Sequence, residues 1–155
     1  MRGSTCGKSV EGQIHSDGAF IGSAMLESNR DVGLLLLHEQ HLQLYRLVEQ
    51  LDSAIGAAAG ECVLVSTLEA LEEYTKVHFG DEEELMQIHG YHSVRAHRAE
   101  HKALTVKLLA ARREYEAGTS GVLASLAPYL HSWLTNHVEG WDRQFYQFLN
   151  ARGLH

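Results

Sequence analysis

Cysteine is nearly absent from this chain, which has two in 155 residues. Cys6 and Cys62 are too few to build a disulfide framework, and neither lies in a C-x-x-C pair. Cys62 opens an apolar stretch with helical spacing, where a cysteine usually packs as a small apolar residue. We therefore expect Cys62 to be a buried structural thiol rather than a metal ligand.

Basic clusters and long apolar runs are also lacking. The chain has 13 Lys and Arg against 20 Asp and Glu, and no basic run that would neutralise phosphates, which argues against nucleic acid as a partner. The longest apolar run, Val32 to Leu37, is far shorter than the roughly 20 residues that cross a bilayer, so we expect no membrane insertion. The first thirty residues lack the apolar centre of a secretory signal, and we expect a cytoplasmic protein.

What the chain does have is the pattern of one helical domain. Hydrophobic residues make up 45% of it, enough for one core. Apolar residues recur at three- and four-residue steps in four stretches, without the two-residue alternation of a strand. The predicted helices span about residues 31–55, 61–86, 91–118 and 121–149. Pro128 conflicts with the last one, because it either lies in the first turn of a shorter helix from near Ser125 or kinks the helix.

These stretches predict an all-α fold, an up-down-up-down four-helix bundle over residues 31–155. Helices of about 25 residues, each about 37 Å long and joined by short Gly-containing links, suit such a bundle. Residues 1–30 are rich in Gly and Ser and predict an irregular N-terminal arm lying over the bundle. Residues 1–4 resemble an expression leader.

Metal-ligand pairs occur twice at helical spacing. His78 and Glu82 are four residues apart, as are His97 and His101, so each pair lies on one helix face and can grip one ion. A break at Gly90 lets the chain reverse and bring the two pairs face to face. Two further segments, residues 39–41 and 137–142, add donors on the other helices. The candidate ligands are His41, His78, Glu82, His97, His101, His137 and Asp142.

Seven such groups on apolar helix faces point to metal rather than to a buried polar layer. An ionisable group there is costly to desolvate unless it is paired or bound to an ion. Imidazole and carboxylate donors suit iron, zinc, copper or manganese. Seven donors exceed the four of a single tetrahedral zinc, so we expect two ions that share the carboxylates.

The order of these motifs resembles the hemerythrin family. The motifs are L-H-E-Q-H at His41, H-F-x-x-E-E at His78, H-x-x-E-H at His97 and W-L-x-x-H-x-x-x-x-D at His137. The resemblance covers roughly Val32 to Leu149, and the long gaps between the motifs are similar to those of the bacterial branch.

This resemblance implies a protein with a non-haem di-iron site that binds dioxygen reversibly. It also implies that the protein is not an enzyme. By the same resemblance, one iron is held by three histidines and the other by two, and the two-histidine iron keeps an open position for dioxygen. Two carboxylates bridge the irons beside an oxo or hydroxo group. The residues in these roles are His97, His101 and His137 on the first iron, His41 and His78 on the second, and Glu82 and Asp142 as bridges.

The chain departs from the family pattern at three places. His38 stands where the family usually has Asp, His92 follows Tyr91 where the family has Pro, and the N-terminal arm has no Trp. These departures affect the packing of the arm and the surroundings of His41, not the ligand set. His38 lies one turn before His41 and could form a hydrogen bond near it or compete as a ligand, and we expect the non-ligand role.

Other functions fit part of the pattern. His97 to His101 also reads as an inverted zincin motif with Glu100 as general base, which would make a zinc hydrolase but leaves the other donors unexplained. A di-iron oxidase or peroxidase fits the same ligands, and a structural metal bundle is a third alternative. Dioxygen binding serves storage, delivery or sensing, and a signalling module is an expected partner if the chain is an excised domain.

One apolar residue is a candidate for the dioxygen pocket. Leu134 lies three residues before His137, on the same helix face and one turn away, so we expect its side chain to project toward the two-iron pocket. The alternative is an ordinary core leucine.

Overall fold

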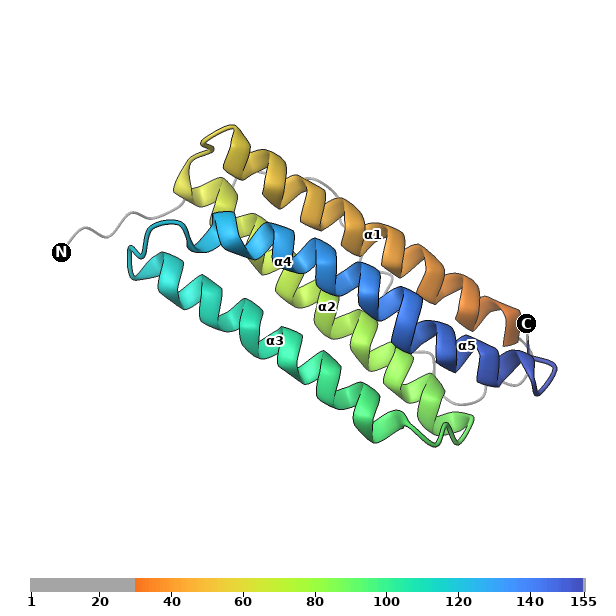
Figure 1. Cartoon of the computed structure of the whole chain (residues 1–155). Helices are drawn as coiled ribbons and strands as arrows, with labels where there is room; N and C mark the ends of the chain where they lie inside the picture. The colour runs from red at the N-terminus through yellow and green to blue at the C-terminus, as the bar shows by residue number, and fades with distance from the viewer. Residues whose placement is uncertain (1–29, 155) are drawn as a thin grey trace.

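The computed structural model describes residues 30–154, and its side chains from residue 33, as a bundle of four antiparallel helices (Figure 1). The first three helices are α1 (Arg30–Gly56), α2 (Glu61–Ile88) and α3 (Val94–Glu116). The fourth is made of α4 (Val122–His137), the π-helix η1 (Val138–Asp142) and α5 (Arg143–Asn150). The predicted all-α, up-down-up-down bundle is thus confirmed, and no described residue lies in a strand.

Tight turns reverse the chain between the helices. The turn between α2 and α3 has Gly90 at φ 64, and the turn between α3 and α4 has Gly118 and Gly121 at φ 85 and 75. These left-handed conformations are strained for residues with a Cβ atom, which is why glycine occupies them. Gly90 therefore marks the predicted reversal that brings α2 and α3 side by side.

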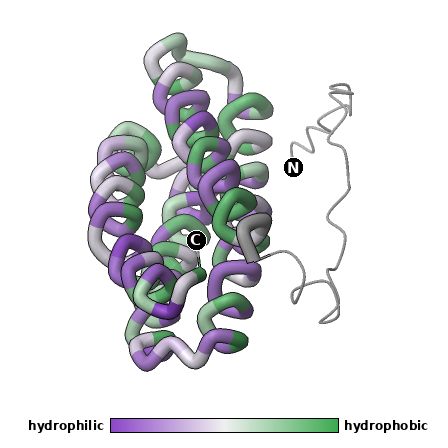
Figure 2. Tube along the Cα trace, turned by 90° about the vertical axis from the view of Figure 1, so that its right-hand side faces the viewer, coloured by the Kyte–Doolittle hydropathy of each residue, from purple (hydrophilic) through white to green (hydrophobic). Residues whose placement is uncertain are grey.

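The core consists of two apolar clusters with a polar layer between them. Each helix shows a hydrophobic and a hydrophilic side (Figure 2). One cluster is built around Leu51, Leu68 and Leu126, and the other around Leu37, Met86 and Phe145. Along every helix the predicted ligands come between residues of the first cluster and residues of the second. The apolar clusters above and below this layer keep water away from it.

Two alternatives were open for Pro128 in the fourth helix. α4 begins at Val122, close to the predicted start at residue 121, and Pro128 lies inside it, so the alternative that placed Pro128 in the first turn of a shorter helix is wrong. Proline cannot donate to the carbonyl four residues earlier, that of Ala124, and this residue is exposed, so water can reach its carbonyl.

Cys62 is also exposed, at the start of α2, and the prediction of a buried thiol is wrong. The first turn of that helix lies at the end of the bundle, where little covers it.

The π-helix η1 is the second departure, because the sequence predicts a continuous α-helix there. Residues five apart in an α-helix point about 140° away from each other, at 3.6 residues per turn. In a π-helix the hydrogen bonds join residues five apart, which brings such residues onto one face. His137 and Asp142 are five apart and both buried, and Trp141, which the α-helical spacing places inward, is only partly buried.

Two further predictions concern other parts of the chain. No helix among the described residues is both long and apolar enough to cross a bilayer. The N-terminal arm and the leader at residues 1–4 lie outside the described residues.

Candidate metal centre

All seven predicted ligands lie in the buried polar layer. His41 comes from α1, His78 and Glu82 from α2, His97 and His101 from α3, His137 from the end of α4, and Asp142 from the last position of η1. Their exposed fractions range from 0% to 4%. Five of them offer donor atoms within 4.8 Å of one another, and these are Glu82, His97, His101, His137 and Asp142.

Three histidines form the densest part of this layer. The Nε2 atoms of His97, His101 and His137 are each 3.0 Å from the other two. Two nitrogens bound to one ion at about 2.1 Å and at right angles would be about 3.0 Å apart. The three rings are therefore already spaced as three neighbouring ligands of a single ion.

The carboxylates of Glu82 and Asp142 lie against the same three histidine nitrogens. Glu82 Oε2 is 3.2 Å from His97 Nε2 and 3.3 Å from His101 Nε2. Asp142 Oδ1 is 3.3 Å from His97 Nε2 and 3.1 Å from His137 Nε2. One oxygen from each carboxylate thus joins the three nitrogens.

The second oxygen of Asp142 faces a different histidine. Asp142 Oδ2 is 3.0 Å from His41 Nε2, and the His41 ring lies edge-on to His78 with ring centroids 4.6 Å apart. The two oxygens of one carboxylate therefore point to two separate groups of histidines, as they would if it bridged two cations. His41 and His78 lie outside the tight group of five and form the second part of the layer.

The carboxylates have buried oxygens that a cation would satisfy. Both oxygens of Glu82, both oxygens of Asp142 and Nε2 of His41 are inaccessible to solvent and make no hydrogen bond. A buried charge without a partner costs several kcal/mol, roughly, unless a counter-charge offsets it. The donor set and these atoms together fit a bound metal better than a set of internal hydrogen bonds.

The pKa values show how strongly the layer is perturbed. Burial raises the pKa of Glu82 to about 7 and lowers that of His78 to about 3, an effect that nearby His41 reinforces. Burial alone would lower the pKa of His97, but the adjacent carboxylates of Asp142 and Glu82 raise it to about 9. Burial opposes ionisation of Asp142, yet its histidine neighbours, His137 first, hold the pKa of that carboxyl well below its usual range. Metal binding here must displace protons, as it does wherever ligands bind deprotonated.

Five further residues orient the ligand rings directly or through a neighbour, and their roles were not predicted from the sequence. The Nδ1 atom of His78 donates to Gln40 Oε1 at 3.0 Å, and Gln40 Nε2 donates to Asp81 Oδ2 at 2.6 Å. Glu83 Oε1 accepts from His101 Nδ1 at 2.9 Å. Two rings stack on ligands: Phe79 on His101 with centroids 3.7 Å apart, and Trp133 on His137 at 4.3 Å. The position of Gln40, directly before the predicted ligand His41, was a signal that could have identified it. No spacing in the sequence distinguishes Glu83 from its acidic neighbours.

The remaining predictions near the site concern residues outside the ligand set. His38 is exposed and lies outside the buried layer, in keeping with a non-ligand role. Glu100 is partly buried and lines a surface pocket of about 220 Å³ between α3 and α4, together with Trp133 and Trp141. His97 and His101 lie together with His137, Glu82 and Asp142. A zinc hydrolase that used the His97 and His101 motif would not account for all of these donors. Leu134 is buried, with 5% of its surface exposed.

Comparison with known proteins places the chain in a family. The family model described as the hemerythrin HHE cation binding domain matches residues 32–149. Similar proteins include a bacteriohemerythrin of Methylococcus capsulatus, 29% identical over 73% of this chain and 86% of that protein. Others come from Stenotrophomonas maltophilia, 28% identical over 77% of this chain and 76% of that protein, and Pseudomonas paraeruginosa, 30% identical over 75% and 74%.

The chain therefore belongs to the hemerythrin family. The seven candidate ligands all lie within the matched range, and the relatives are bacterial hemerythrins, as the spacing of the motifs predicts.

Proposed function

We propose that the buried layer holds two iron ions and that the loaded protein binds dioxygen reversibly without turning it over. The observation that carries this proposal is the carboxylate of Asp142, whose two oxygens face two separate histidine groups at 3.0 to 3.3 Å. A single ion would need only one of these groups. Two ferrous ions held by these residues would supply the two electrons that reversible dioxygen binding requires.

Iron suits this donor set. Five imidazoles and two carboxylates, without a thiolate, favour iron, manganese, copper or zinc over softer metals. Neutral imidazoles leave two carboxylates and one hydroxide to offset most of the charge of two ferrous ions. Membership of a family described by cation binding supports a metal here.

The protein's own residues divide the work between the two parts of the layer. His97, His101 and His137, with one oxygen from each carboxylate, surround one position closely, while His41 and His78, with the second oxygen of Asp142, serve the other. The second position therefore keeps coordination sites for dioxygen. The apolar clusters on both sides exclude water from it, which protects the irons from irreversible oxidation.

Metal analysis with a spectrum tests the proposal. Protein from iron-supplied cells should contain close to two irons per chain, and the reduced form should gain visible absorption in air and lose it when oxygen is removed. One zinc per chain and no colour would contradict the proposal. Steady oxygen consumption would instead indicate a di-iron oxidase or peroxidase.

Two substitutions give this test a matched control. Glu82→Ala removes a shared carboxylate and should lose or scramble the iron pair. His131→Ala alters a partly buried histidine outside the layer and should leave the iron content unchanged. Equal iron content in both variants would remove Glu82 from the ligand set.

The biological use of the bound oxygen is also a proposal. Storage or delivery requires oxygen to leave again with the irons reduced, whereas sensing requires a partner that responds to the loaded state. We propose either role for this site in the cytoplasm, with a signalling module as the partner in the sensing case. Knowing whether the gene continues past residue 155 into a signalling module would help to distinguish the two roles.

A further inference from the structure

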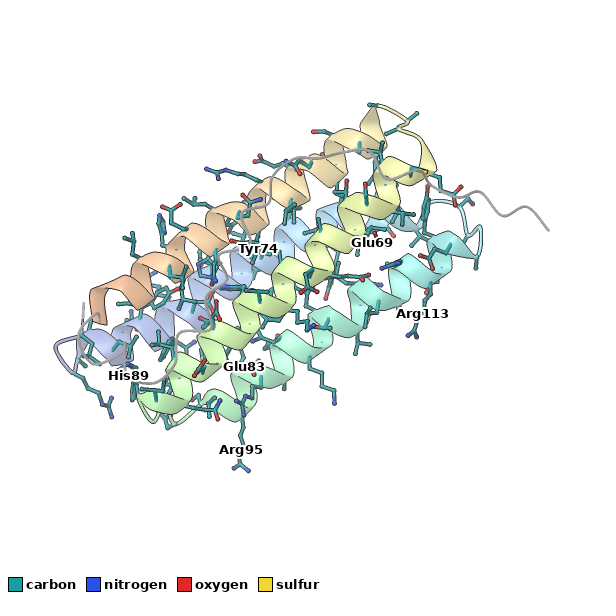
Figure 3. The ribbon with its side chains drawn as sticks, turned by 180° about the vertical axis from the view of Figure 1, so that it is seen from behind. Glu69, Tyr74, Glu83, His89, Arg95 and Arg113 are labelled. Carbon is teal, nitrogen blue, oxygen red and sulfur yellow. The ribbon has the colours of Figure 1, made fainter. Side chains whose placement is uncertain are left out.

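The His101 ring has both a stacked neighbour and a hydrogen-bond partner on its outer nitrogen. Phe79 lies flat against it, with ring centroids 3.7 Å apart and planes 4° apart. Nδ1, the ring nitrogen of His101 that faces away from the other ligands, donates to Glu83 Oε1 at 2.9 Å. The other oxygen of Glu83 accepts from Arg98 Nε at 2.8 Å. Glu83, labelled in Figure 3, comes from α2 where that helix runs beside α3. His101, Glu83 and Arg98 thus form a chain of contacts from the centre to the surface.

The histidine of the other group has a neutral partner instead. His78 Nδ1 donates to the amide oxygen of Gln40, and the same amide is fixed by Asp81. The side chains of His78 and His101 are both buried, and each donates through Nδ1 to one oxygen. The main difference between the two partners is therefore their charge. Glu83 is a carboxylate with 22% of its side chain exposed, while Gln40 is a buried amide.

We propose that Glu83 is a positioning residue that makes His101 an electron-rich ligand and so favours the oxidised state of the three-histidine iron, with Arg98 moderating this effect. The inference rests on the proposed di-iron function. A carboxylate that accepts the outer proton of an imidazole fixes the ring and raises the basicity of the metal-bound nitrogen. A more basic ligand stabilises the higher positive charge of a ferric ion. An arginine bound to the same carboxylate withdraws part of its negative charge.

The layout gives the two iron positions different tendencies. The position backed by Glu83 should oxidise more readily than the position whose histidine is backed by Gln40. The side chain of Arg98 is 41% exposed, whereas His101 is buried, so the residue that moderates the charge of Glu83 lies at the surface. A charge at the surface can then influence the centre through two hydrogen bonds rather than across open space.

The decisive experiment measures the reduction potential of the iron-loaded protein. Glu83→Gln keeps an oxygen that accepts from His101 Nδ1 but removes the charge. We expect iron content near that of the parent and a shift of about tenfold toward the ferrous form, about 59 mV higher for a one-electron step. Glu84→Gln is the matched control, because it removes the same charge from the neighbouring, exposed residue. Equal potentials in the two variants would overturn the proposal.

A second variant tests the same chain from its outer end. Arg98→Gln frees the charge of Glu83 and should lower the potential, the opposite sign to Glu83→Gln. Arg95→Gln is its control, on the same helix one turn earlier and exposed, as Figure 3 shows. In the double variant the effect of Arg98→Gln should vanish, because Arg98 acts through Glu83. An unchanged or raised potential in Arg98→Gln would contradict the inference even if Glu83→Gln fails to hold iron, and full additivity in an iron-loaded double variant would contradict it as well.

Metal binding without redox chemistry supplies an independent readout. Cobalt(II) binding to the metal-free protein should weaken about 10- to 100-fold in Glu83→Ala, which leaves His101 Nδ1 without its partner, and far less in Glu83→Gln. Cobalt(II) affinities equal to that of the parent in both variants would show that Glu83 does not position His101. A parent protein that holds no iron at all would instead reject the di-iron function, and this outcome is separate from a failure of Glu83 to act.

Discussion

Replacing Leu134 by Ala should make the reduced protein oxidise irreversibly faster while it still holds two irons. The side chain is 5% exposed and stands one turn before His137 on the same helix. The change removes three carbon atoms, which costs roughly 0.8 kcal/mol each in lost burial and more for the cavity, within the range of about 2 to 5 kcal/mol for buried Leu to Ala. Domains of this size are stable by about 5 to 15 kcal/mol, so the variant should remain folded at room temperature.

The magnitude of the oxidation effect depends on what fills the new cavity. A water molecule takes up about 30 Å³ in the liquid and enters a protein cavity only where polar partners hold it. Next to the imidazoles and carboxylates of the metal layer such partners exist, so a cavity at Leu134 should take up water. If this water lowers the barrier to oxidation by about 1.4 kcal/mol, the rate rises about tenfold.

Leu130→Ala provides the control. Leu130 is 3% exposed, lies one turn earlier on α4, and belongs to the larger apolar cluster. The same three carbons are removed there, but the cavity is lined by apolar side chains and should stay dry. The assay follows the loss of oxygen-dependent absorption at equal iron content in both variants. Equal oxidation rates in the two would show that Leu134 is only a core residue and would refute the reasoning.

Three other outcomes follow from the same structure. Asp142→Asn puts a nitrogen toward one of the two histidine groups, so iron content should fall from about two to about one per chain; two irons in this variant would contradict a bridging role. In the metal-free protein, the folded pKa of His97, about 9, lies above its unfolded value of 6.5, so folding binds a proton and stability should fall as pH rises from 7 to 9; Glu82, raised from 4.5 to about 7, adds a fall of the same sign at lower pH. A melting temperature that is equal or higher at pH 9 would argue against this. A circular dichroism spectrum of the full chain should be strongly helical, and substantial β-sheet would reject the bundle.

The sequence predicted the layout of the fold because its signals are local. Apolar spacing placed all four helices, and the pairs four residues apart placed His78, Glu82, His97 and His101 on inward faces. The reversal between the pairs needed a residue that tolerates positive φ, and Gly90 supplied it. Such features depend on neighbouring residues along the chain and can be read without knowing what packs against them.

Features that depend on packing between helices were not predicted. Glu83 meets His101 across the α2 and α3 interface, 18 residues away in sequence, and its acidic neighbours look the same in the sequence. Cys62 was expected to be buried because its stretch is apolar, but the end of a bundle covers its first turn poorly. Pro128 is tolerated inside α4 because the carbonyl it leaves without a partner belongs to an exposed residue.

The π-helix absorbs one additional residue of the chain within the fourth helix. It contains one residue more than a regular helix needs to keep its buried face, so Phe145 and Leu149 beyond it still face the core. Deleting Gly140 would let the helix close as an ordinary α-helix with these side chains still facing inward. The same deletion would leave His137 and Asp142 four residues apart, a spacing that an α-helix also places on one face. A shortened chain of this kind should therefore fold into the same bundle with both residues still on the buried face, so the π-helix is what lets the fold carry one more residue without turning Asp142 away from the histidines.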